Sequence, residues 1–219
     1  MLDNDGACLP RGKISAALCD TPYARTFFNW SIVNNTIQRK NLIYYVDIDT
    51  LFSAYVAYYA PSSKYLDNLI IFKPRGRKIA DIISNICSTE EENLSLVVID
   101  SVSLLYELYS AQFGFGESTR IFSLYLAMLK NFAIDRDVTI LVTSLARSKK
   151  SSIKNNWKTS YPGGRSLDAF SSAIFSLQTD PQIIEISVLK HPNNQLTSNK
   201  FMVDAPALSK FHLNHIKPN

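Results

Sequence analysis

The sequence predicts an α/β protein whose twisted, mostly parallel sheet is flanked by helices and ends in antiparallel strands. Apolar, β-branched segments alternate with helical patterns as far as residue 144. One segment, residues 94–100 (LSLVVID), is almost entirely apolar, as expected of a central strand that is covered on both faces. Beyond residue 144 we expect no further helix, because the strand-like segments SSAIFSL, IIEISVL and NKFMVD follow one another across short polar turns.

The elements are expected in the following order. The first half contains strand 12–18, helix 26–40, strand 42–48, helix 52–60, strand 69–72 and helix 77–87. The second half contains strand 94–100, a long helix that Ser118 or Thr119 caps and that ends near Ile134, and strand 138–144. The helices are recognised by apolar residues three and four positions apart, such as Ile79, Ile82 and Ile86.

The composition indicates a protein with one core. With 219 residues, 46% hydrophobic and 19% charged, we expect a single domain, residues 1–219, with its core at about 12–204 and a short polar C-terminal tail. Three scattered cysteines without CxxC spacing indicate neither a disulfide framework nor a zinc site, and we expect no metal. No apolar run reaches the roughly 18 residues that span a bilayer, and the polar start is unlike a signal peptide. We therefore expect a cytoplasmic protein with no membrane partner.

Basic residues gather in one segment. The net charge is +4, from 23 basic and 19 acidic residues. Between residues 138 and 167 there are six basic residues and no acidic ones, and without these six, 17 basic residues face 19 acidic ones. Cations interleaved with aromatic rings are what a binding site for single-stranded nucleic acid requires. We expect the following residues to contact single-stranded DNA: Arg147, Lys149, Lys150, Lys154, Trp157, Lys158, Tyr161 and Arg165. A solvated loop over residues 146–164, without a ligand, is the alternative.

The turn between the first strand and its helix, residues 19–26 (CDTPYART), stands where a phosphate-binding P-loop would stand. Of the pattern GxxxxGK[ST], only the final hydroxyl residue is present, with an arginine in place of the lysine. Glycines are needed there because the backbone must turn successive N–H groups onto the phosphates. The residues at this degenerate nucleotide-binding position are Asp20, Thr21, Ala24, Arg25 and Thr26. An ordinary turn that Asp20 or Thr21 caps is the alternative.

Carboxylates end two of the predicted strands. Asp100, followed by Ser101, closes LVVID, which matches a Walker B strand whose aspartate holds Mg²⁺. Asp47 and Asp49 close the earlier strand in VDIDT and are candidate general bases. Aspartates at strand ends are also common turn and capping residues, so the pattern alone leaves both interpretations open.

The order of these segments resembles the ATPase core of the RecA/RadA recombinase superfamily, most closely its archaeal RadA paralogues. The likeness runs from about residue 12 to residue 204. It places Arg25 and Thr26 at the P-loop lysine and hydroxyl positions, Asp49 at the position of the catalytic glutamate, and Asp100 on the Walker B strand. Residues 110–120 (SAQFGFGESTR) are similar to the first DNA-binding loop of that family. The stretch that closes with Gly163-Gly164 resembles the second.

The departures from the family pattern fall in its ATPase site. Both P-loop glycines, the lysine and the glutamate are changed, and Leu145 replaces the glutamine that senses the γ-phosphate. The resemblance thus implies a RecA-like fold with no assigned catalytic residue, Asp49 and Asp100 being vestigial. We expect no cofactor, and bound ATP with magnesium is the alternative. We therefore expect a non-catalytic paralogue that is associated with the nucleoid. It is expected to bind single-stranded DNA, or a recombinase or another paralogue, and to act in homologous recombination and repair.

Two other functions remain open from the sequence. The first is a divergent ATPase in which Arg25, Asp49 and Asp100, with Thr26, still bind and slowly hydrolyse ATP. The second is a structural subunit whose basic segment contacts only acidic protein. Phe113 and Phe115, in the segment similar to the first DNA-binding loop, are expected either to form an interaction surface or to fold into the core.

Overall fold

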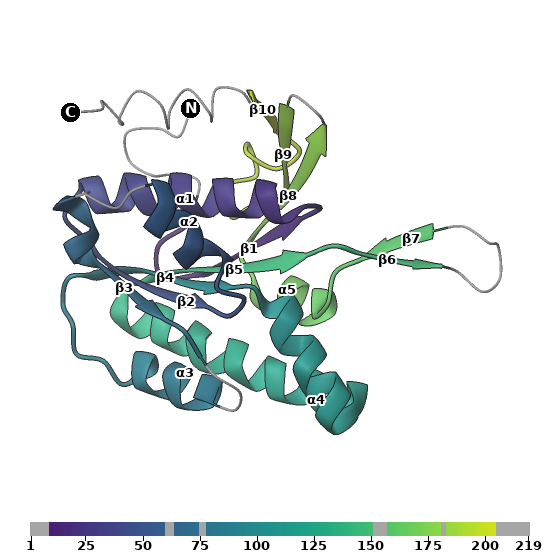
Figure 1. The fold of residues 1–219 in the computed structure, drawn as a ribbon, viewed down its shortest axis with the longest axis horizontal. Helices are drawn as coiled ribbons and strands as arrows, with labels where there is room; N and C mark the ends of the chain where they lie inside the picture. The colour runs from purple at the N-terminus through teal and green to yellow at the C-terminus, as the bar shows by residue number, and fades with distance from the viewer. Residues whose placement is uncertain (1–8, 60–63, 75–77, 151–156, 181–182, 205–219) are drawn as a thin grey trace.

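The computed structural model describes residues 9–59, 64–74, 78–150, 157–180 and 183–204, and its centre is an eight-stranded sheet (Figure 1). The strands of this sheet are β1 (Ile14–Cys19), β2 (Leu42–Asp47), β3 (Leu69–Phe72), β4 (Leu94–Asp100), β5 (Thr139–Leu145), β8 (Ala173–Asp180), β9 (Ile183–Lys190) and β10 (Lys200–Asp204). Their spatial order is β10-β9-β8-β1-β5-β4-β2-β3. All pairs from β8 to β3 are parallel, and β8–β9 and β9–β10 are antiparallel, so the predicted fold class is confirmed.

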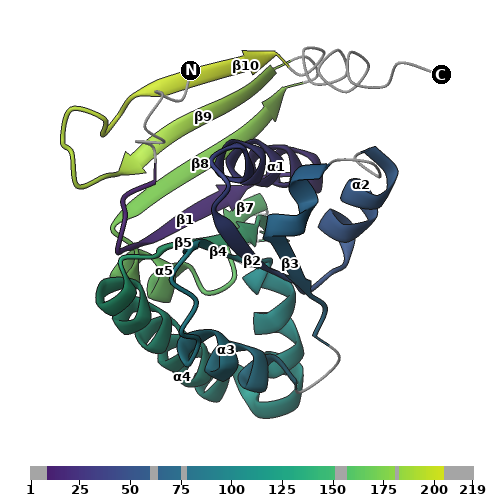
Figure 2. The same ribbon diagram turned by 90° about the vertical axis from the view of Figure 1, so that its left-hand side faces the viewer.

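Helices cover both faces of the sheet (Figure 2). One face carries α1 (Pro22–Gln38) and α2 (Leu51–Tyr59), and the other carries α3 (Ile79–Cys87), α4 (Val102–Arg136) and α5 (Gly164–Phe170); a short 3-10 helix, η1 (Lys64–Asn68), precedes β3. Successive strand residues point to opposite faces, so Val97 packs in the core on the α4 side and Val98 in the core on the α1 side. The apolar run 94–100 is buried on both sides for this reason. Among the described residues, no helix has the length and apolar character needed to cross a membrane.

Helix α1 begins four residues earlier than the sequence predicted. Thr21 caps it, with its hydroxyl accepting a hydrogen bond from the backbone N–H of Ala24 at 3.2 Å, and Pro22 occupies the first turn. The expected start at Thr26 is therefore wrong. Only Asp20 and Thr21 separate β1 from the helix, and Ala24, Arg25 and Thr26 lie within the helix itself.

Residues 110–120, expected as a loop, belong to α4. The helix runs on either side of Gly114, where the backbone takes φ 80° and ψ 165° and the helix kinks. The predicted cap at Ser118 or Thr119 is also wrong, because both lie inside the helix. Their hydroxyls donate to the carbonyls of Gly114 and Phe115, four residues earlier. The backbone at Gly114 is not helical, so it separates two helical segments of α4. Hydrogen bonds between Tyr106 and Thr119 and between Tyr109 and Tyr125 show that the second segment folds back against the first.

Residues 146–164 also contain more regular structure than a loop. Strands β6 (Arg147–Lys150) and β7 (Trp157–Ser160) pair antiparallel in a separate two-stranded sheet, which projects from the body of the protein (Figure 1). A short helix, α5, then precedes β8, so the expectation of no helix beyond residue 144 is wrong. Lys154 and the expected tail, residues 205–219, lie outside the described residues.

Candidate functional site

The parallel strands place four sequence-predicted positions along one edge of the sheet. β1, β5, β4 and β2 are consecutive neighbours, and their carboxyl ends hold Cys19, Leu145, Asp100 and Asp47. Cys19 pairs in register with Leu145, and Asp47 with Asp100. This is the edge at which open α/β sheets carry their ligands.

Arg25 extends from α1 into this edge and contacts two of the carboxylates. Its Nη2 lies 2.6 Å from Oδ2 of Asp49, and its Nε lies 3.1 Å from Oδ1 of Asp100. The side chains of Arg25 and Asp100 are fully buried, whereas that of Asp49 is 22% exposed. Arg25 is thus held between the two carboxylates by ion pairs.

For both Arg25 and Asp100, burial and the neighbouring charges shift the pKa in opposite directions. Burial lowers the pKa of Arg25, but the neighbouring charges of Asp100 and Asp49 outweigh it, and the net shift of the Arg25 pKa is upward. Burial also raises the pKa of Asp100, and here Arg25, Thr143 and Tyr45 oppose the shift without cancelling it. The guanidinium therefore stays charged.

Both oxygens of Asp100 are occupied by groups of the protein. The Tyr45 hydroxyl donates to Oδ2 and the Thr143 hydroxyl to Oδ1, which Arg25 also contacts. The Asn29 amide donates in turn to the Tyr45 oxygen at 2.8 Å. A Walker B carboxylate would have to direct an oxygen towards a metal ion or its water, whereas this one is engaged inside the core.

Asp47, Asp49 and Asp100 have the residue types of a metal site but do not fit one in this arrangement. One carboxylate oxygen from each lies within 4.8 Å of the others, a spacing that a hard cation could bridge. Arg25, however, already contacts two of the three, and Oδ2 of Asp47 accepts hydrogen bonds from the backbone and hydroxyl of Ser53. A magnesium ion would be held against a buried guanidinium, so Mg²⁺ with ATP does not fit beside Arg25.

The polar groups of the short turn before α1 are also hydrogen-bonded within the protein. Both carboxylate oxygens of Asp20 accept hydrogen bonds from Thr179 on β8, one from its backbone N–H at 2.6 Å and one from its hydroxyl at 2.8 Å. The backbone N–H of Arg25 donates to the carbonyl of Thr21 at 3.2 Å. The backbone N–H of Ala24 is likewise bonded to the hydroxyl of the Thr21 cap. Backbone N–H groups are therefore already paired at the place where a P-loop would present them to phosphates.

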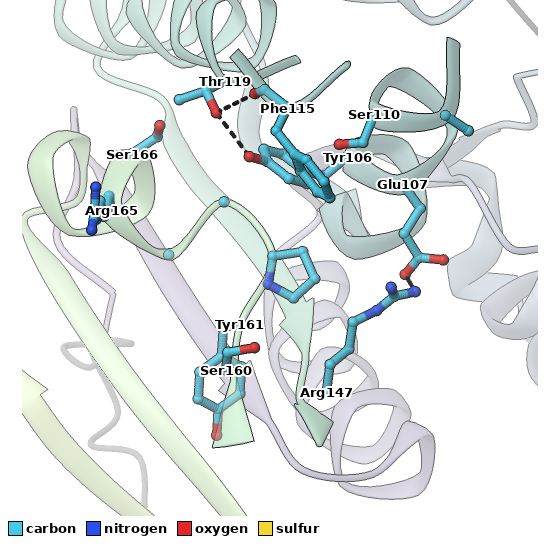
Figure 3. A pocket seen from close by; sticks show the side chains of 14 residues that line it. Tyr106, Glu107, Ser110, Phe115, Thr119, Arg147, Ser160, Tyr161, Arg165 and Ser166 are labelled. Carbon is cyan, nitrogen blue, oxygen red and sulfur yellow. Dashed lines mark hydrogen bonds and ion pairs between the residues drawn. The ribbon is translucent and has the colours of Figure 1, made fainter. Parts of the chain in front are cut away.

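A pocket of about 860 Å³ lies between the kinked helix α4 and the segment that leads from β7 into α5 (Figure 3). It brings together the two segments that are similar to DNA-binding loops. The α4 side contributes the aromatic rings of Tyr106 and Phe115 and the hydroxyl of Thr119. The second segment contributes Tyr161 and both cations, Arg147 and Arg165. Arg147 and Arg165 lie on different sides of the pocket in Figure 3, so cations flank an aromatic centre.

Several contacts fix the shape of this pocket. The hydroxyl of Thr119 bonds to that of Tyr106 at 2.8 Å and donates to the Phe115 carbonyl. Gly163 has φ +73°, and a Cβ there would come within 2.5 Å of the Phe122 ring, so packing requires the glycine. The half-buried Tyr161 has a raised pKa, chiefly because of burial, with a hydrogen bond to Ser176 opposing the shift. Its hydroxyl thus points towards β8.

The predicted DNA-binding residues divide into two groups. Arg147, Tyr161 and Arg165 line the pocket. Lys149, Lys150, Trp157 and Lys158 belong to the β6–β7 ladder, in which Lys149 is the register partner of Lys158 and Lys150 that of Trp157. The hairpin therefore continues the basic segment outward from the pocket.

The comparisons with known proteins support the fold and nothing finer. No protein-family model and no curated protein sequence matches the chain. Among solved structures, the crystal structure of the RadB recombinase superposes with a TM-score of 0.66 at 17% identity, over 89% of this chain and 87% of that one. The fold is RecA-like.

Within this RecA-like core, Arg25 contacts both Asp49 and Asp100. Leu145, by contrast, packs with apolar residues on the α1 side of the sheet. Sequence reasoning missed the residues that surround them. Tyr45 and Thr143 could have been noticed, because each is a polar residue within an otherwise apolar strand, and a buried polar group needs a partner. Nothing in the sequence links Glu107 to Arg147, although their side chains form an ion pair at the pocket.

Proposed function

We propose that this RecA-like chain binds single-stranded DNA without hydrolysing ATP and assists a recombinase-type partner, or another paralogue, in homologous recombination and repair. One observation carries the proposal. Arg25 is buried against Asp49 and Asp100, the residues that a nucleotide and its metal would need, while the two DNA-binding segments still enclose a cationic, aromatic pocket. Association with the nucleoid follows from DNA binding.

The energetics of the Arg25 cluster support the absence of turnover. For ATP and magnesium to enter, the guanidinium would have to leave two carboxylates, one of which is fully buried. Separating a buried ion pair leaves an uncompensated charge in the core, which costs about 3–5 kcal/mol. Phosphate contacts would have to offset this cost in a turn that has no glycine and whose Pro22 has no N–H.

Three features support single-stranded DNA as the ligand of the pocket. Residues 138–167, which supply both cations of the pocket, contain six basic residues and no acidic residue. Aromatic residues lie among the cations, as base stacking requires. In addition, Lys149 and Lys158 are register partners in the two-stranded ladder, so several basic residues of the segment belong to one hairpin.

The proposed partner is a protein of the recombination machinery. The RadB likeness is the basis for this class of partner. Three large apolar side chains on α4 support it: Leu108, Phe113 and Phe115 are 52%, 45% and 69% exposed, and Phe115 lines the pocket. Exposed apolar side chains that gather into a patch are typical of interaction surfaces.

The test is an anisotropy titration of a labelled oligo-dT strand with the full chain, without nucleotide, at a series of salt concentrations. If four to five of the cations meet phosphates, the logarithm of the association constant falls against log salt with a slope of about −3 to −3.5. Polyglutamate is the competitor that separates DNA binding from a subunit that recognises acidic protein. The proposal fails if no binding occurs at low salt, or if polyglutamate displaces the strand as well as unlabelled oligo-dT does.

A further inference from the structure

The pocket contains one ion pair that joins its two walls. Glu107 on α4 and Arg147 on β6 both line the pocket, and the Glu107 carboxylate contacts the Arg147 guanidinium (Figure 3). The two side chains are 34% and 42% exposed, so both can be reached from solvent. Glu107 is the only acidic residue among the fourteen described residues that line the pocket.

A carboxylate and a phosphate present similar oxygen pairs to a guanidinium. Arginine binds both groups through paired N–H donors, and for this reason each can take the place of the other. In the free protein, then, Glu107 holds Arg147 in the kind of contact that a DNA phosphate would make. An exposed ion pair is weak in water, so a strand that gains several other contacts can displace it.

We infer that Glu107 limits the affinity of the proposed DNA interface, because it occupies Arg147 as an internal substitute for phosphate. The inference rests on the proposed function, because it concerns the same pocket. A strand must exchange Glu107 for one of its own phosphates before Arg147 contributes to binding. Glu107 thereby lowers affinity, and it reduces the net release of counterions on binding because Arg147 is already paired with a carboxylate in the free protein.

The test compares the wild type, Glu107→Gln, Arg147→Ala and the double variant in the oligo-dT titration. Glu107→Gln keeps the shape of the side chain, removes its charge and releases Arg147. It should lower Kd by about two- to fivefold at low salt, the range of an exposed ion pair. It should also steepen the salt slope by about 0.7, the share of one further phosphate contact with a single strand. Glu107→Ala provides a second variant, and melting midpoints verify that each variant is folded.

Glu185→Gln is the matched control. Glu185 on β9 pairs with Lys200 on β10 at 2.8 Å, so this change also removes one negative charge and one exposed ion pair, but on strands that do not line the pocket. The inference requires that Glu107→Gln gains more than Glu185→Gln, and that the excess disappears in the Arg147→Ala background. An equal gain from both variants, or a gain that persists without Arg147, would overturn it. If none of the variants binds DNA, the proposed function itself is wrong.

Discussion

Arg25 and Asp100 form an ion pair in the core of the protein, with Nε and Oδ1 3.1 Å apart and both side chains fully buried. The pair joins α1 to the carboxyl end of β4, and through Asp49 it also reaches the end of β2. Arg25 thus provides positive charge to a cluster of carboxylates whose residue types are those of a metal site. Its planar guanidinium can contact two carboxylates at once, which a lysine ammonium could not do with the same fixed geometry.

Replacement of Arg25 should destabilise the protein strongly. Arg25→Ala leaves Asp100 buried without its cation, and we expect a loss of about 3–5 kcal/mol in the free energy of unfolding, measured by chemical denaturation. Arg120→Ala is the control, because Arg120 pairs with Glu117 at 2.7 Å but is 79% exposed. That change should cost no more than about 1 kcal/mol. Equal, small losses for both variants would mean that the buried pair contributes little.

Removal of Arg25 should also open the carboxylate cluster to a divalent cation. The oxygens of Asp47, Asp49 and Asp100 lie within 4.8 Å of one another, and without the guanidinium their charges are uncompensated. We expect millimolar Mg²⁺ or Mn²⁺ to raise the melting midpoint of Arg25→Ala, because binding to the folded state stabilises it, and to leave the wild type unchanged. The double variant Arg25→Ala/Asp49→Asn should lose most of this response. A cation effect of the same size in the wild type would contradict the description of the cluster.

The raised pKa of Asp100 predicts the sign of one pH dependence. Burial raises the pKa above its ordinary value of 3.8, so the folded protein keeps this proton to a higher pH than the unfolded chain does. The contribution of Asp100 to stability is therefore greatest below pH 3.8 and falls as pH rises from there through the folded pKa. The stability of the wild type relative to Asp100→Asn, measured by denaturation at each pH, should decline across that window. A rise would mean that Arg25 outweighs burial.

The basic hairpin should account for much of the salt dependence of DNA binding. Replacement of Lys149, Lys150 and Lys158 by alanine should reduce the slope of log K against log salt by about 2, from roughly 0.7 per phosphate contact. The control replaces three exposed lysines that do not line the pocket: Lys13 and Lys40, just before β1 and β2, and Lys130 on α4. Because none of these belongs to the pocket or the hairpin, that variant should keep the slope. Equal effects of both triple variants would show a general charge effect and no localised site.

Burial patterns explain why the fold was predictable from the sequence. A nearly all-apolar strand such as residues 94–100 is stable only where both faces of the sheet are covered, so its place in the middle of the sheet follows from its composition. The start of α1 was missed because Thr21-Pro22, a capping signal, was assigned to a loop. Gly114 and Gly116 indicated a loop because a glycine kink and a glycine loop look alike in sequence. Pairs such as Arg25–Asp49 arise only from tertiary packing, and the sequence predicted only that both residues lie near the same edge of the sheet.

The most direct test of the account is the rate of ATP hydrolysis by the wild type at saturating single-stranded DNA, compared with that of Asp100→Ala. Because Arg25 occupies the carboxylates and the turn before α1 is closed by Thr21 and Thr179, the account predicts no turnover above the Asp100→Ala background. DNA binding should be the same with and without ATP and magnesium. Hydrolysis by the wild type that Asp100→Ala abolishes would contradict the central claim.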